Sequence, residues 1–214
     1  MAKIHPNNPV SVATSSDDDG DRTAAAAAAA AMTVWRKSLL FNCKGFTVYD
    51  GTGNLLFRVD NYSSSSSSSG EIVLMDAYGK CLVTIKRKRL SIGEKWLIYS
   101  GEEAIKPEFS VKKNMSFHQS KVLARVTTSS SSSSSSSSNP TDRCRHSYSI
   151  EGSYSHNQCT IYDDRRRPVG EVERKEAAAG IALGCDVFRL VVQPELDAPL
   201  AMAMVIALEQ MYGS

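Results

Sequence analysis

The chain lacks the sequence features of secreted and disulfide-stabilised proteins. Its five cysteines, Cys43, Cys81, Cys144, Cys159 and Cys185, are odd in number and scattered, and no two form a C-x-x-C pair. The N-terminus carries no positively charged segment followed by an apolar one, so it does not resemble a secretory leader. We therefore expect an intracellular, cytoplasmic protein whose thiols stay reduced.

Long hydrophobic runs and a charge excess of one sign are also absent. No segment reaches the roughly 20 apolar residues that a transmembrane helix needs, so any membrane contact would be peripheral. Lysine and arginine number 25 against 23 aspartates and glutamates among 214 residues. This balance is too even to predict a nucleic-acid partner.

Catalytic and metal-binding motifs are missing as well. The sequence contains no G-x-S-x-G, no H-E-x-x-H and no glycine-rich phosphate loop, and its four histidines fall in predicted tail, loops or strand ends. Cys144, His146, His156 and Cys159 are of the types that bind zinc, but their spacing is poor for a tetrahedral site. We predict that the protein is not an enzyme and has no catalytic residue, cofactor or metal.

The most informative segment is the last one, residues 197–213. Asp197 is a good N-cap, Pro199 suits the first helical turn, and Gly213 suits the position after the helix. Between them, residues 198–208 are apolar on every side. Such a helix must be buried, and at about 17 Å it is too short for a bilayer core of about 30 Å. The predicted core side chains are Leu200, Met204, Val205, Ile206 and Leu208.

Three low-complexity tracts delimit a single domain. Residues 1–32 form a predicted disordered tail that ends in the alanines 24–31, which are too few for a stable isolated helix. Serine tracts at 63–69 and 129–138 are predicted to be flexible, expanded loops because they carry nothing to bury. The predicted folded domain is 33–213, and we expect it to be a monomer.

Between these tracts the apolar residues recur with a period of two, which indicates strands. We predict twelve: 33–37, 45–50, 55–60, 71–77, 81–87, 96–101, 108–113, 122–127, 147–153, 159–163, 169–175 and 186–193. Compact turns at 50–54 and 77–80 make consecutive strands antiparallel hairpins. A mainly β fold, a closed antiparallel barrel of about twelve strands enclosing the C-terminal α-helix, hides the helix and leaves no long sheet edge.

Several runs resemble the plant LURP-one-related family. They are T-V-W-R-K-S-L-L-F-N-C-K-G-F-T-V-Y-D at 33–50, L-F-R-V-D-N-Y at 56–62, V-L-M-D at 73–76, I-K-R-K-R-L-S at 85–91, D-V-F-R-L-V-V-Q-P at 186–194, and the closing helix. The resemblance implies the Tubby C-terminal-like fold and a distant relation to phospholipid scramblases and to Tubby proteins, which bind phosphoinositides. It also implies a setting in plant defence or stress response. The family's biochemical activity is essentially undefined.

Two basic segments are candidate phosphate sites. Lys86, Arg87, Lys88 and Arg89 could bind phosphoinositide phosphates or act as a nuclear address. In a strand their side chains would alternate between the two faces, so they could equally be solvated strand-end charges. Arg165, Arg166 and Arg167 lie in a predicted turn before Pro168, which would expose them to a phosphate.

These observations leave three hypotheses about function. The first is a non-enzymatic binding module that acts at phosphoinositides or other anionic membrane surfaces. The second is an adaptor that binds an unknown protein and has no lipid affinity. The third is a scramblase-like activity, against which stand the lack of a cysteine-rich acylation run and of an acidic calcium loop, since Asp163 and Asp164 run directly into the three arginines.

Overall fold

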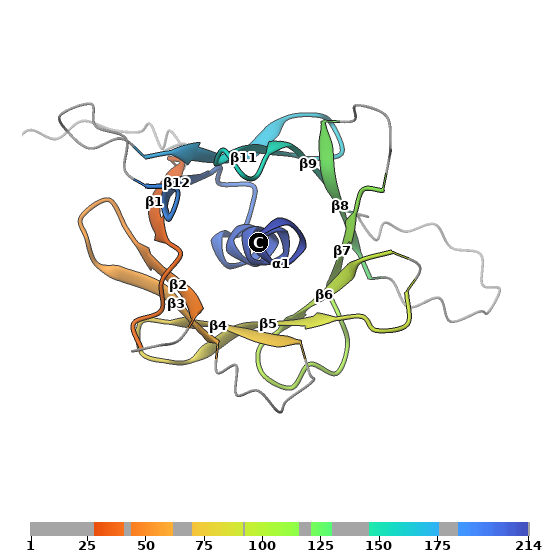
Figure 1. Ribbon diagram of the computed structural model, residues 1–214, viewed down its shortest axis with the longest axis horizontal. Coiled ribbons are helices and arrows are strands. Elements are labelled where there is room, and N and C mark those ends of the chain that lie inside the picture. The colour runs from red at the N-terminus through yellow and green to blue at the C-terminus, as the bar shows by residue number, and fades with distance from the viewer. Residues whose placement is uncertain are drawn as a thin grey trace, which may run out of the picture.

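A computed structural model describes residues 28–40, 44–61, 70–91, 93–115, 121–129, 146–175 and 184–213. These residues form twelve strands and one helix (Figure 1). The elements are β1 (Ala30–Trp35), β2 (Lys44–Tyr49), β3 (Leu55–Asn61), β4 (Glu71–Asp76), β5 (Cys81–Arg87), β6 (Lys95–Ser100), β7 (Phe109–Lys113), β8 (Val122–Thr128), β9 (Ser147–Ser153), β10 (Gln158–Tyr162), β11 (Pro168–Arg174), β12 (Val187–Val192) and α1 (Ala198–Tyr212).

The twelve strands close into one antiparallel barrel. Each strand pairs with its neighbours in the sequence, and β1 pairs with β12 to complete the ring. Every described strand therefore has a partner on both sides, which removes the sheet edges that would otherwise invite aggregation. The predicted closed barrel of about twelve strands is confirmed.

Helix α1 fills the barrel, and Figure 1 looks down its axis. Asp197 caps it by accepting a hydrogen bond from the Leu200 amide at 3.2 Å, and Pro199 lies in the first turn. The predicted core side chains Leu200, Met204, Val205, Ile206 and Leu208 are all buried. Gly213 follows the helix in an extended conformation, and its amide donates to the Glu209 carbonyl at 2.7 Å.

The first strand begins earlier than the sequence predicted. β1 starts at Ala30, within the predicted tail 1–32, and Ala30, Ala31 and Met32 pair with the last residues of β12. Pairing with β12 satisfies backbone groups that a short alanine helix would leave to water, so tertiary contact overrides helix propensity here. Residues 1–27, the serine tract 63–69 and residues 130–138 of the second tract lie outside the described residues.

Two predicted hairpin turns have the expected chemistry. The Asp50 carboxylate accepts hydrogen bonds from the Thr52 and Asn54 amides, each at 2.8 Å, and the Asn54 side chain lowers the pKa of this carboxyl well below its ordinary value. Gly53 and Gly79 adopt φ of 90° and 88°, a region that favours glycine. These turns fix the register of the hairpins that they join.

The barrel has two mouths, which we name after the helix. The C-terminal mouth is the end at which α1 ends, and the N-terminal mouth is the end at which it begins. Lys113, the last residue of β7, donates to the Met211 carbonyl at 2.5 Å, so the β5–β6 and β7–β8 connections lie at the C-terminal mouth. The β4–β5, β6–β7 and β10–β11 connections lie at the opposite mouth, because adjacent strands are antiparallel.

Candidate functional site

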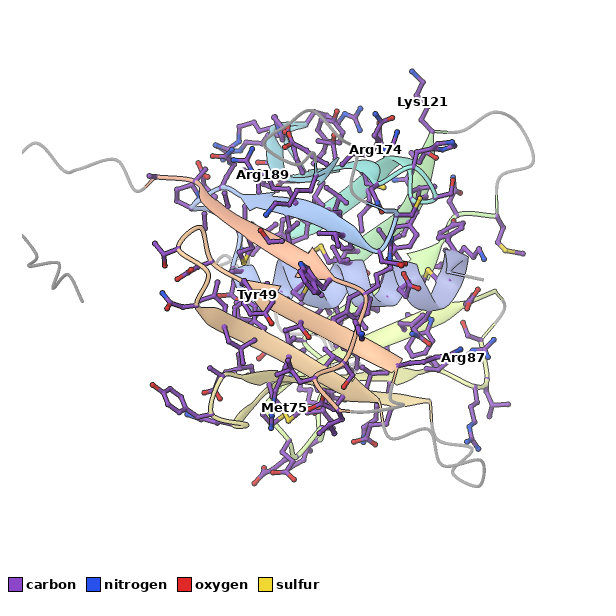
Figure 2. All side chains as sticks on the ribbon, turned by 60° about the vertical axis from the view of Figure 1, so that its left-hand side comes forward. Tyr49, Met75, Arg87, Lys121, Arg174 and Arg189 are labelled. Carbon is purple, nitrogen blue, oxygen red and sulfur yellow. The ribbon has the colours of Figure 1, made fainter. Side chains whose placement is uncertain are left out.

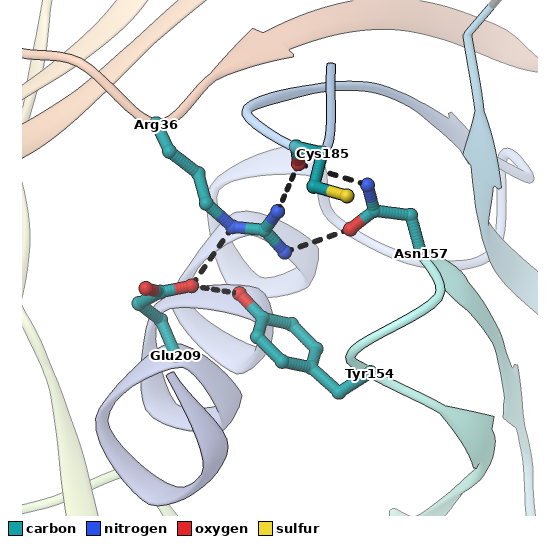
Figure 3. A network of polar contacts seen from close by, with 5 residues as sticks. All are labelled: Arg36, Tyr154, Asn157, Cys185 and Glu209. Atoms are coloured by element: carbon teal, nitrogen blue, oxygen red, sulfur yellow. Dashed lines mark hydrogen bonds and ion pairs between the residues drawn. The ribbon is translucent and has the colours of Figure 1, made fainter. Parts of the chain in front are cut away.

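At the C-terminal mouth, a polar network around Arg36 connects the barrel wall to the helix (Figure 3). Its Nε donates to Glu209 Oε2 at 2.9 Å, and another guanidinium nitrogen donates to Asn157 Oδ1 at 2.8 Å. The Tyr154 hydroxyl donates to the same Glu209 oxygen at 2.5 Å. Burial raises the pKa of Tyr154 well above its ordinary value, so this phenol stays protonated. The network joins β1, the β9–β10 turn and the helix.

A second clamp lies at the same mouth. Lys113 Nζ contacts Glu94 Oε2 at 3.2 Å and lies 4.4 Å from the centre of the Tyr212 ring. The Tyr212 hydroxyl in turn donates to the Leu123 carbonyl at 2.9 Å. These contacts hold the last helical turn in place, and the charges of Lys113 and Glu94 neutralise each other.

The basic run 86–89 lies at the same end, where β5 leaves the barrel wall. Lys86 and Lys88 point outward, as the strand alternation predicted, but Lys86 is neutralised by Glu71 at 3.1 Å. Arg87, Lys88 and Arg89 are exposed and line a depression of about 600 Å³ together with Gly70, Ser91, Gly93 and Glu94. Figure 2 shows Arg87 extending from this end of the barrel. Among the described residues that line the depression, Glu94 alone carries a carboxylate, and it is already paired with Lys113.

Strand register extends this basic surface across three further strands. The Lys88 amide donates to the Lys95 carbonyl at 2.9 Å, Lys95 lies opposite Lys112, and Lys112 lies opposite Arg125. Their neighbours Trp96 and Val111 are buried inside the barrel, so the four cations face outward. Arg87 lies opposite Trp96, on the other side of β5, and is exposed where the strand ends at the mouth. We call the four outward cations, together with Arg87 and Arg89 at the rim beside them, the basic face.

The basic face is electrostatically unfavourable in the absence of an anion. Like charges directly opposite one another on a sheet destabilise it. Burial lowers the pKa of Lys95, and the charges of Lys88 and Lys112 lower it further. Within the described part of the chain no carboxylate forms an ion pair with Lys88, Lys95 or Lys112. An anionic ligand would relieve this repulsion.

The second predicted phosphate segment, 165–167, differs from the first because most of its charge is paired with carboxylates. Arg166 forms a two-pronged ion pair with Glu151 and packs on the Tyr162 ring at 4.6 Å, and Arg167 pairs with Asp163 at 2.7 Å. Two of the three arginines are thus balanced by carboxylates. The turn that contains Arg165, Arg166 and Arg167 lies at the N-terminal mouth, so the fold does not unite it with the basic run 86–89.

The sequence did not reveal Lys95, Lys112 and Arg125 as a group. Each is a single cation in its strand, and only the pairing of β6 with β7 and of β7 with β8 brings them into one row. The sequence signal that could have revealed this group is a basic residue at an outward-facing position near the same end of each consecutive strand. It becomes usable only when the register is known.

Among the described residues, no cluster of three or more histidine, cysteine, aspartate or glutamate side chains is arranged to hold a metal ion. Cys144, one of the four potential zinc ligands, lies outside those residues. The only described helix, α1, is too short to cross a membrane.

A twelve-stranded barrel closed around an apolar C-terminal helix defines the Tubby C-terminal-like class of proteins. The profile of the LURP-one-related family matches residues 30–209, and the chain therefore belongs to that family. It is 41% identical to Protein LURP-one-related 8 of Arabidopsis thaliana over the full length of both chains. It is 38% identical to Protein LURP-one-related 12 of the same plant, with 85% of this chain and 78% of the relative covered.

The fold also has a counterpart among solved structures. The X-ray structure of an Arabidopsis thaliana protein superposes with a TM-score of 0.57 at 20% identity, covering 86% of this chain and 91% of the other. At that identity the likeness concerns the fold alone.

Proposed function

We propose that this protein is a non-enzymatic module whose basic face binds the phosphates of anionic phospholipids, phosphoinositides among them. The observation that supports this proposal is the row of outward cations from Lys88 to Arg125. Its three lysines form no ion pair with a described carboxylate, and only Arg125, at the end of the row, lies near one, that of Glu151. The setting in plant defence or stress response is carried over from the family resemblance.

The chemistry of the face suits a phosphorylated headgroup. Arg87 and Arg89 can each donate two parallel hydrogen bonds to one phosphate, whereas Lys88, Lys95 and Lys112 act as point charges. Each cation near an anionic membrane surface contributes about 1 kcal/mol, and salt screens this contribution within about 10 Å at 0.1 M. Binding should therefore weaken steeply as the salt concentration rises.

Vesicle flotation of the full chain tests the proposal. Wild-type protein should float with vesicles that contain phosphatidylserine or phosphatidylinositol bisphosphate, and not with vesicles of phosphatidylcholine alone. The double variant Lys95→Gln/Lys112→Gln should lose about 2 kcal/mol of binding, or about thirtyfold in affinity. Its matched control is Lys80→Gln/Lys106→Gln, which removes two exposed lysines at the N-terminal mouth and should bind as wild type.

Three results would contradict the proposal. Wild-type protein that binds none of the vesicles is one, and this result would favour the adaptor hypothesis. Binding that ignores lipid charge and salt is another. Equal losses in the two double variants would show a response to net charge rather than to the basic face. Because Lys95→Gln/Lys112→Gln removes a repulsion, its melting temperature should equal or exceed that of wild type, which separates lost binding from lost folding.

A further inference from the structure

Two exposed apolar side chains project from the C-terminal mouth beside the basic face. Leu90, in the β5–β6 connection, is 93% exposed, and Met115, after β7, is 59% exposed. A Cβ placed on Gly93 would lie 3.8 Å from Met115 Cγ, so the two connections run side by side. Leu90 follows Arg87, Lys88 and Arg89 directly, and Met115 comes three residues after Lys112.

The N-terminal mouth also carries exposed apolar side chains, but in the opposite electrostatic setting. Tyr78 is 96% exposed and Ile105 is 82% exposed. Asp76 lies two residues before Tyr78, and Glu102, Glu103 and Glu108 surround Ile105 in the sequence. This end also carries Lys80, Lys106 and the turn 165–167, but Arg166 and Arg167 are paired with carboxylates, and the described carboxylates of its connections outnumber the cations. An anionic surface would therefore attract the C-terminal mouth more strongly than this one. The charge of the two mouths, and not their apolar area, thus decides which end such a surface meets.

On the basis of the proposed function, we infer that the barrel docks end-on, with its C-terminal mouth against an anionic bilayer and with Leu90 and Met115 inserted between the lipid headgroups. The barrel leans towards the wall formed by β5 to β8, so that the outward cations of the basic face reach phosphates around the two inserted side chains. An inserted leucine and methionine add an apolar contribution that salt does not screen.

Paired variants of the full chain test this orientation in vesicle flotation. Leu90→Ser/Met115→Ser should weaken binding to phosphatidylserine vesicles at least about fivefold, and by the same factor at low and at high salt. The loss caused by Lys95→Gln/Lys112→Gln should shrink as salt rises. Ile105→Ser is the matched control at the acidic mouth and should bind within about twofold of wild type.

A direct depth measurement completes the test. Bromine on the lipid acyl chains should quench the added fluorescence of Leu90→Trp and leave that of Ile105→Trp unchanged. Lack of quenching at position 90, with wild-type affinity in Leu90→Ser/Met115→Ser, would overturn the insertion and leave the electrostatic proposal intact. Quenching at position 105 would overturn the orientation. Wild-type protein that binds no anionic vesicle would refute the proposed function itself, and the docking mode with it.

Discussion

The contact between Tyr154 and Glu209 should couple the barrel wall to the helix energetically. Removing the Glu209 side chain leaves the Arg36 guanidinium without its carboxylate. Removing one partner of a fully buried ion pair lowers the free energy of unfolding by about 3 to 5 kcal/mol. Arg36 and Glu209 are 15% and 26% exposed, so solvent screening reduces the effect. We expect Glu209→Ala to lower the free energy of unfolding by about 2 to 3 kcal/mol.

Tyr154→Phe removes one hydroxyl and creates no cavity. A hydrogen bond to a charged group contributes about 1.5 to 3 kcal/mol, and Glu209 retains Arg36, so we expect a cost of about 1.5 kcal/mol. When Glu209 is already alanine, the hydroxyl has lost its acceptor, and the same substitution should cost close to nothing. The expected coupling energy is therefore also about 1.5 kcal/mol.

Urea unfolding of the wild type, both single variants and the double variant measures this coupling. The midpoints should shift while the denaturant slope stays constant. Tyr78→Phe, which removes a hydroxyl from a side chain that is 96% exposed, is the control and should leave the midpoint unchanged. The reasoning fails if Tyr154→Phe costs the same whether position 209 is glutamate or alanine.

Three further predictions concern the core, a close backbone approach and a buried thiol. Ile206→Asp places an unpaired carboxylate at a position that is 0% exposed and should abolish cooperative unfolding. The control Ile206→Val should lower the free energy of unfolding by about 1 kcal/mol. A soluble, cooperatively melting Ile206→Asp protein would disprove the placement of the helix. Gly45→Ala should cost about 3 kcal/mol in urea unfolding, because its Cβ would lie 1.9 Å from the Val59 carbonyl oxygen, and Gly51→Ala, with nothing within 4 Å, should be neutral. Burial raises the pKa of the Cys159 thiol to about 11, so the folded state holds this proton more tightly than the unfolded chain, whose thiol titrates near 8.5. Its contribution to stability is complete below pH 8.5 and is lost as the pH rises towards 11; the difference in unfolding free energy between wild type and Cys159→Ala should shrink across that window, and a constant difference would argue against the raised pKa.

The architecture could be predicted because its determinants are local. The period of two in the strands and the uniformly apolar helix are both readable along the chain, and closure of the barrel follows from the need to bury that helix. The start of β1 was harder to predict. Ala30 and Ala31 favour a helix in isolation and form a strand only because they pair with Val192 and Val191.

The candidate site depended on contacts that no local pattern contains. Arg36 and Glu209 are 173 positions apart and meet because β1 and the helix end at the same mouth. On the sequence alone, both basic segments, 86–89 and 165–167, were candidate phosphate sites. The structure distinguishes them, since Arg166 and Arg167 pair with Glu151 and Asp163 while Lys88, Lys95 and Lys112 face one another across the strands.

The filled interior of the barrel restricts where any ligand can bind. From Ala201 to Ala207 every residue of the helix is 0% exposed, so the space that an empty barrel would offer to a small molecule is occupied by the chain itself. Within the described part of the chain, the surfaces left for recognition are the outer wall and the two mouths. There, charged side chains can be exchanged without disturbing the core. A row of like charges lowers stability, and the chain gains nothing from it within its own fold. If Lys95→Gln/Lys112→Gln both raises the free energy of unfolding and weakens vesicle binding about thirtyfold, the repulsion is maintained for a ligand and not for the barrel.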